Sequence, residues 1–203
     1  MFFLKEQLVK HIKNNSYLYV FLFIVFMIGT TSGAFTVNNL KDVQKEELIN
    51  YLTKFHQIKN SVDISTVSIF KQSLLNNFQT VFILWVLGAT IIGIPLIFIV
   101  IFARGFVLGF SLSILISEYK FKGILVILAS VLPQNIFIIL GIIFISATSI
   151  NFSLYILKNR KSGINDLISQ FISYTFVVYS GFLVIILGSL IESYLSLYIL
   201  LLN

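Results

Sequence analysis

The stretch that decides the fold runs from Asn76 to Asn135 and reads NNFQTVFILWVLGATIIGIPLIFIVIFARGFVLGFSLSILISEYKFKGILVILASVLPQN. From Phe82 to Ser117 its only charged residue is Arg104. A helix needs about 20 apolar residues to cross a bilayer, so this run is too long for one crossing and slightly short for two. It predicts either two helices of unequal length that meet at Arg104 and Gly105, or a full span followed by a re-entrant segment whose backbone is buried in protein.

The composition of the whole chain is that of an integral membrane protein. Its 203 residues are 58% hydrophobic and only 11% charged, and the formal net charge is +6. Soluble domains of ordinary composition carry about 25% charged residues. In a membrane protein a basic balance reflects orientation and anionic lipid headgroups, so we expect the lipid bilayer as a partner and no nucleic acid. The absence of cysteine excludes disulfides and thiolate chemistry.

The first part of the chain predicts a surface segment followed by a membrane span. Residues 1–16 place Leu4, Leu8 and Ile12 at four-residue spacing among lysines. They form either a cytoplasmic amphipathic helix on the membrane or a solvated start, and the lysines favour a cytoplasmic N-terminus in both cases. Residues 17–37 are long enough to cross. A cleaved signal peptide with its cleavage site at 32–34 is the alternative.

Residues 38–78 are the only extended polar region. Two apolar stripes at helical spacing predict an amphipathic helical hairpin, extracytoplasmic and lying on the membrane or against the bundle. The first stripe is the candidate surface for a partner and consists of Leu48, Leu52, Phe55 and Ile58. A passive connector between spans is the alternative.

The rest of the chain, residues 79–203, predicts further spans at 80–103, 123–151 and 172–190, with a short or re-entrant segment at 105–117. Together with the first span this gives about five crossings in one all-α polytopic domain, 1–203. Five crossings place the basic cluster at 158–161 in the cytoplasm with the N-terminus, as the positive-inside tendency requires. Four crossings place that cluster outside.

Four polar or helix-breaking residues form a candidate functional core: Arg104, Pro133, Gln134 and Asn135. Arg104 either snorkels at the cytoplasmic end of a span or is a buried charge with a functional partner. The run at 133–135 is either a broken helix whose amides face a cavity, or a proline kink whose amides bond between helices. Glu192 is either an interfacial carboxylate or a buried functional one.

Six glycines have the spacing of helix-packing positions. Small residues four apart let two helices approach closely, and seven apart they share one helix face. The positions are Gly29, Gly33, Gly105, Gly109, Gly181 and Gly188. They predict close helix contacts, and homo-oligomerisation through Gly29/Gly33 or Gly105/Gly109 is a further hypothesis.

The sequence carries no motif of an enzyme. It contains no H-E-x-x-H, G-x-S-x-G, phosphate-binding loop or dinucleotide fingerprint, and its two histidines lie in polar flanks. The acidic residues near 42–47 alternate with lysines, as on a solvated helix face. We therefore expect no catalytic residue, no metal, no cofactor and no enzymatic activity.

The order of several weak motifs resembles the stage II sporulation protein M family. They are the Asn76-Asn77 pair, Gly88 and Gly93, the Arg104-Gly105-x-x-x-Gly109 run, and Pro133-Gln134-Asn135. The wider family often has asparagine at position 104, and Pro-His-Gly followed by a glutamate at the proline. Here Gln134 and Asn135 replace the His-Gly pair and Ile138 takes the acidic position. This departure argues against proton or metal chemistry there and resembles the branch found in endospore-forming bacteria.

The resemblance implies a multi-pass protein of the mother-cell membrane that is needed for engulfment of the forespore. It implies a non-enzymatic scaffold that recruits or localises peptidoglycan hydrolases at the septum, with partners resembling stage II sporulation proteins D and P. A small channel, exporter or flippase that uses the Arg104 to Asn135 core is the competing class.

Overall fold

The chain forms a bundle of long α-helices. The computed structural model describes residues 15–41, 43–45, 47–48, 66–126, 131–159 and 164–202. The long helices within these residues are α2 (Ser16–Asn38), α4 (Thr66–Gly88), α5 (Gly93–Val126), α6 (Leu132–Lys158) and α7 (Ile164–Leu202). The predicted segment 1–16 falls almost wholly outside the described residues.

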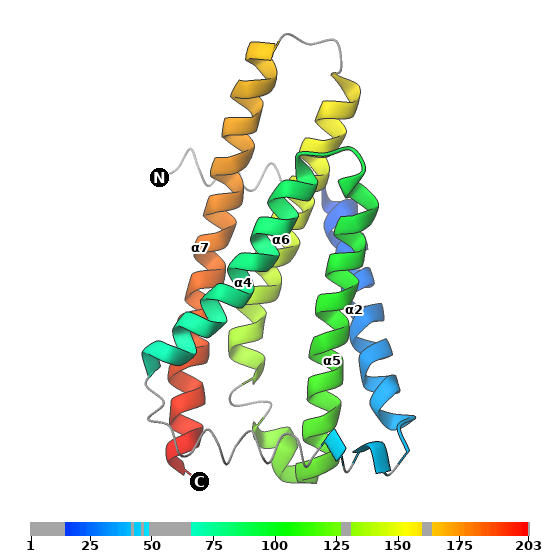
Figure 1. Ribbon diagram of the computed structural model, residues 1–203, viewed down its shortest axis with the longest axis vertical. Helices are drawn as coiled ribbons and strands as arrows, with labels where there is room; N and C mark the ends of the chain where they lie inside the picture. The colour runs from blue at the N-terminus through cyan, green and yellow to red at the C-terminus, as the bar shows by residue number, and fades with distance from the viewer. Residues whose placement is uncertain are drawn as a thin grey trace.

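The five helices run in alternating directions along the long axis of the molecule (Figure 1). α4 and α5 are joined at one end, near the C-terminus of α6 and the N-terminus of α7. The C-termini of α2, α5 and α7 lie at the other end. This up-and-down order is the one that the five-span prediction requires.

Four of the described helical segments are long and apolar enough to cross a membrane: Ser16–Asn38, Gly93–Ser117, Leu132–Lys158 and Ile164–Leu195. The predicted fold class, an all-α polytopic membrane protein, is therefore confirmed. α4 runs alongside these segments, but its first half carries Lys71, Gln72, Asn76 and Asn77, which lower its hydropathy.

The predicted boundaries around Arg104 are wrong. No helix runs from 80 to 103, because the chain turns between Gly88 and Gly93. Thr90 accounts for the turn: its Oγ1 donates to the carbonyl of Leu87 at 2.9 Å, and its own carbonyl accepts from the N–H of Gly93 at 3.2 Å. Pro95 then lies in the first turn of α5, where its missing N–H leaves no helical bond unmade.

The segment 105–117 is neither short nor re-entrant. It is the second half of a continuous span, Gly93–Ser117, so the helix has no break at Arg104 or Gly105. The helical conformation is interrupted only at Lys120, whose φ is 47°. The bend therefore lies after the span, in the charged segment 118–122.

Pro133 does not break a span either. α6 begins at Leu132 with the proline in its first turn, a position where proline is favoured. The span predicted at 123–151 corresponds to α6, which begins and ends later, and the span predicted at 172–190 corresponds to the longer helix α7.

The predicted hairpin at 38–78 is wrong for residues 66–78, and most of residues 38–65 lie outside the described residues. Residues 66–78 are the first half of α4, which packs inside the bundle and buries Ser73 and Asn77. The prediction failed because polar residues at helical spacing indicate an amphipathic helix but not whether its polar face meets water or protein. Leu48 borders a small cavity with Val37, Leu40 and Ile114, whereas Leu52, Phe55 and Ile58 lie outside the described residues.

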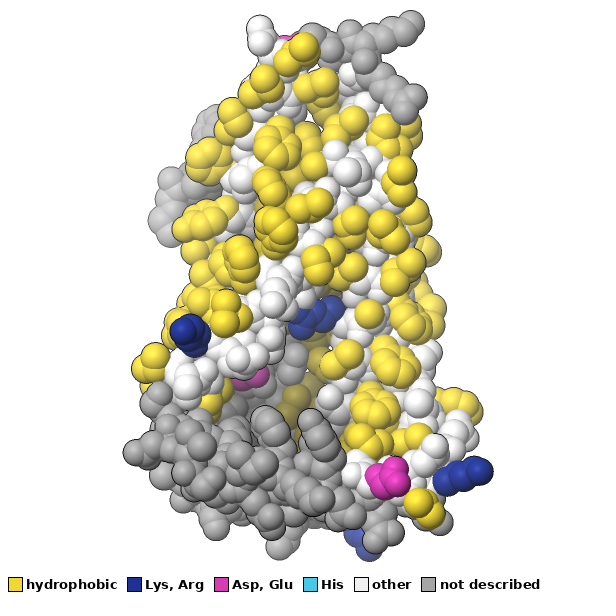
Figure 2. Space-filling model, viewed as in Figure 1, with side chains coloured by type: hydrophobic (Ala, Val, Ile, Leu, Met, Phe, Trp, Pro, Cys, Tyr) yellow, Lys and Arg dark blue, Asp and Glu magenta, His cyan; other side chains and the backbone are white. Residues whose placement is uncertain are grey.

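The core lies where α6 meets the other helices. α6 is the most buried of the candidate spans, at 67% of its apolar window, and α2 packs mainly on α5 while α6 packs mainly on α7. The surface is largely hydrophobic, with a few charged side chains among uncharged polar atoms (Figure 2). Such a surface fits contact with lipid acyl chains.

Candidate functional site

The α2–α5 contact is built from two pairs of glycines that face each other. A side chain at Gly29 or Gly33 would collide with the backbone of Phe102 or Phe106 in α5. A side chain at Gly105 or Gly109 would collide with the backbone of Phe26 or Thr30 in α2. The four glycines are buried within one chain. Their faces are therefore not open to a second copy, and the predicted route to self-association through them is wrong.

The other two predicted glycines belong to the α6–α7 contact. Gly181 lies against the side chains of Phe144 and Ile145, and Gly188 lies against Ile138 and the carbonyl of Gln134. All six glycines thus act as helix-packing positions inside the chain, as their spacing predicts.

Arg104 lies near the middle of its span. At 1.5 Å per residue it is about 17 Å from Gly93 and about 20 Å from Ser117. It is the only charged residue of that segment. The prediction that it snorkels at a cytoplasmic end is therefore wrong, and the alternative, a charge inside the bundle, describes its position.

The guanidinium of Arg104 is held by α4. Its Nη2 donates to the backbone carbonyl of Asn76 at 2.9 Å and also to Oγ1 of Thr80. Insertion of an arginine at the centre of a membrane helix costs about 2.5–3.5 kcal/mol on translocon scales. A hydrogen bond to a charged group contributes about 1.5–3 kcal/mol. Two such hydrogen bonds together are large enough to offset the cost of inserting the arginine.

A second polar group joins the same face of the bundle to α7. Asn77 Nδ2 donates to Ser189 Oγ at 3.1 Å and to Ser73 Oγ at 3.4 Å. Ser73 Oγ in turn donates to Oε2 of Glu192. Glu192 is half-buried and lies near the end of the candidate span Ile164–Leu195.

We call these residues the α4 polar face: Ser73, Asn76, Asn77 and Thr80, one above another at helical spacing. They bond Arg104 of α5 on one side and Glu192 and Ser189 of α7 on the other. No ion pair joins Arg104 to an acidic side chain among the described residues. Sequence reasoning missed this face because it assigned residues 66–78 to an extracytoplasmic hairpin and Thr80 to a separate span.

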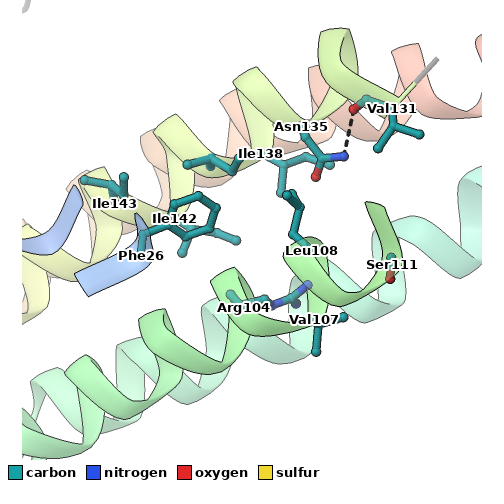
Figure 3. Close-up of a pocket in the computed structure, with 11 residues that line it drawn as sticks. Phe26, Arg104, Val107, Leu108, Ser111, Val131, Asn135, Ile138, Ile142 and Ile143 are labelled. Carbon is teal, nitrogen blue, oxygen red and sulfur yellow. Dashed lines mark hydrogen bonds between the residues drawn. The ribbon is translucent and has the colours of Figure 1, made fainter. Parts of the chain in front are cut away.

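A cavity of about 200 Å³ lies between α2, α5 and α6. It is lined by Arg104, Val107, Leu108 and Ser111 of α5 and by Val131, Asn135 and isoleucines of α6, and Leu108 points toward α6 (Figure 3). Apart from Arg104, Ser111 and Asn135, its walls are apolar.

Two members of the predicted functional core meet at this cavity and two do not. Arg104 and Asn135 both line it, and Asn135 Nδ2 donates to the carbonyl of Val131 at 2.8 Å (Figure 3). Gln134 is buried away from it, and its Oε1 has no hydrogen-bond partner among the described residues. Pro133 only starts α6.

The chemistry that this site offers is recognition of an anion. A guanidinium binds carboxylate and phosphate oxygens through a planar fork of N–H groups. The described residues contain no group of three or more His, Cys, Asp or Glu that could hold a metal ion.

The fold and the site define an all-α, multi-pass membrane protein whose interior holds an arginine bonded to a polar helix face. The model of the family described as stage II sporulation protein M matches residues 22–197, which is most of the chain. The chain belongs to this family and is a sporulation-related membrane protein. No curated protein and no solved structure matches it.

Proposed function

We propose that this protein is a non-enzymatic membrane scaffold that recruits or localises peptidoglycan hydrolases for septal wall removal and engulfment during endospore formation. The family match over residues 22–197 carries the proposal, because it covers the helical bundle from α2 to α7. The partners we propose resemble stage II sporulation proteins D and P, and the site of action is the mother-cell engulfing or septal membrane.

The internal packing supports this proposal. The glycine contacts and the α4 polar face join the helices within one chain. Such a body is suited to presenting its ends to partners without rearranging. Two of the three features that favoured a transporter, a span broken at Pro133 and a re-entrant segment at 105–117, are replaced by helices without a break there. The third, amides at 134 and 135, remains.

We assign the partner surface to the end of the bundle that holds the C-termini of α2 and α5. A cytoplasmic N-terminus places this end outside, on the side of the wall. Beyond Lys120 the last part of α5 lies across this end (Figure 1). Lys41 and Lys45 follow α2 at the same end, where Lys41 is exposed and Lys45 is half-buried.

Co-purification from sporulating cells tests the proposal. The variant Lys41→Glu/Lys45→Glu reverses the charge of the outer end, and Lys158→Glu at the opposite end is the matched control. We expect wall hydrolases to co-purify with the wild type and the control but not with the double variant, at equal amounts of inserted protein. Absence of hydrolases from the wild-type sample contradicts recruitment, and their retention by the double variant contradicts this surface.

A further inference from the structure

The cavity between α2, α5 and α6 combines a positive charge with apolar walls. Arg104 reaches it from α5, and Phe26, Leu108, Ile138 and Ile142 supply much of the apolar lining. The proposed scaffold function uses neither the charge nor the cavity, so the question of what occupies it stands apart from that function.

The guanidinium retains donors for a ligand. An arginine has five N–H donors. Both hydrogen bonds of Arg104 leave from Nη2, to Asn76 and Thr80, so α4 uses only that nitrogen. The N–H groups on Nε and Nη1 make no hydrogen bond to a described residue. No acidic side chain among the described residues pairs with Arg104, so none of them compensates its positive charge.

The position of the site favours an occupant from the bilayer. Arg104 lies near mid-depth in an apolar span, away from both aqueous faces. Val107 lines the cavity and is 62% exposed on the lipid-facing surface of α5, so it forms a rim open to lipid. A cavity of about 200 Å³ is large enough for a headgroup-sized group but not for acyl chains. The chains then lie outside, along the apolar surface.

We propose that this cavity binds an anionic glycerophospholipid, with its phosphate diester on the free N–H groups of Arg104 and its acyl chains on the apolar surface around Val107. A net negative headgroup compensates the charge of Arg104, whereas a zwitterionic headgroup brings its own cation. Asn135 and Ser111 are the polar neighbours available to the headgroup. The bound headgroup lies deeper than those of the surrounding leaflet, as snorkelling and local thinning allow.

Quenching of a tryptophan by brominated lipids measures this preference in the full-length protein. The chain has one tryptophan, Trp85, so a Trp85→Phe background is free of other signals. Val107→Trp places a reporter on the cavity rim. Phe176→Trp is the control reporter, because Phe176 is 71% exposed on α7 and does not line the cavity. Vesicles contain brominated phosphatidylglycerol or brominated phosphatidylcholine.

We expect phosphatidylglycerol to bind at the Val107→Trp reporter about tenfold more strongly than phosphatidylcholine, which corresponds to about 1.4 kcal/mol. The Phe176→Trp reporter should show no preference. Arg104→Gln should abolish the preference, and Lys71→Gln, which removes another basic side chain, should keep it. Ser111→Phe fills the cavity while retaining Arg104, and it should also abolish the preference. This variant tests the proposal even if Arg104→Gln does not fold.

Three results would overturn the proposal. Equal quenching by the two lipids at the cavity rim shows that no anionic lipid is selected. A preference that survives Ser111→Phe, or Arg104→Gln in folded protein, places the lipid elsewhere. Loss of the preference on adding inorganic phosphate at constant ionic strength shows that the occupant is a free anion.

Discussion

The glycine contact between α2 and α5 makes a quantitative prediction for Gly109→Ala. A Cβ at this position would meet the backbone of Thr30 in α2, including its carbonyl oxygen. Overpacking costs about 1–3 kcal/mol, and backbone atoms cannot rotate away as a side chain does, so the upper end applies. Alanine returns up to about 1 kcal/mol through its higher helix propensity. The free energy of unfolding should therefore fall by about 2 kcal/mol.

Gly181→Ala is the matched control because it makes the same chemical change in a different contact. The Cβ would lie 2.7 Å from Ile145 Cγ1 and 2.9 Å from Phe144 Cδ1, both of them side-chain atoms. These side chains can adjust, so the overpacking cost falls to about 1 kcal/mol and is offset by helix propensity. We expect Gly181→Ala to change stability by less than about 0.5 kcal/mol.

Unfolding by SDS in mixed micelles, followed by Trp85 fluorescence, measures both variants. Trp85 contacts Phe82 and Phe171, so its emission reports separation of α4 from α7 when the bundle opens. The reasoning is refuted if Gly109→Ala is as stable as Gly181→Ala, or if Gly181→Ala is the more damaging change. Gly33→Ala, which meets the backbone of Phe106, should repeat the result of Gly109→Ala from the opposite helix.

Three further predictions test the polar contacts and the orientation. Thr80→Val should lower the free energy of unfolding by about 1–3 kcal/mol, because it removes a hydrogen-bond partner of the charged Arg104. In an Arg104→Met background the same change should lower it much less. Equal losses in the two backgrounds, measured by SDS unfolding, would contradict the bond. Tyr174→Phe should lower the free energy of unfolding by about 1 kcal/mol in the same assay. The reason is that the hydroxyl of Tyr174 hydrogen-bonds Ser149 at 3.0 Å and the carbonyl of Trp85 at 2.9 Å. Unchanged stability would argue against these bonds. Because the chain lacks cysteine, Lys45→Cys should react with an impermeant maleimide in intact cells and Lys158→Cys only after permeabilisation, whereas the reverse pattern would invert the proposed orientation.

Composition and spacing were sufficient for the fold class, although not for the helix boundaries. The apolar runs locate the membrane helices, and the glycine spacings locate their close contacts, because both signals depend on one helix at a time. The glycine partners required a second helix. The spacing of Gly29 and Gly33 fits either another copy or another helix of the same chain, and only the fold shows that Gly105 and Gly109 face them.

The helix ends near Arg104 could not be read correctly because the decisive signals are small. Reading Arg104 as a membrane boundary follows the usual behaviour of a charge in an apolar run. The actual boundary is formed by Thr90, Gly93 and Pro95, whose role depends on a local turn rather than on hydropathy. Pro133 was misread for the converse reason, since a proline inside an apolar run indicates a break only when a helix precedes it.

Arg104 and the polarity of α4 explain each other. Taken alone, α4 is too polar in its first half to score as a membrane span, and α5 contains a charge where none is expected. The contact between α4 and α5 explains both features, because Asn76 and Thr80 supply the acceptors that a guanidinium needs inside the bundle. A hydropathy scale assigns each helix its own cost of insertion and omits bonds between helices. The polar face of α4 and the arginine at mid-depth are thus one structural feature, and a sequence with either alone would leave polar groups unpaired.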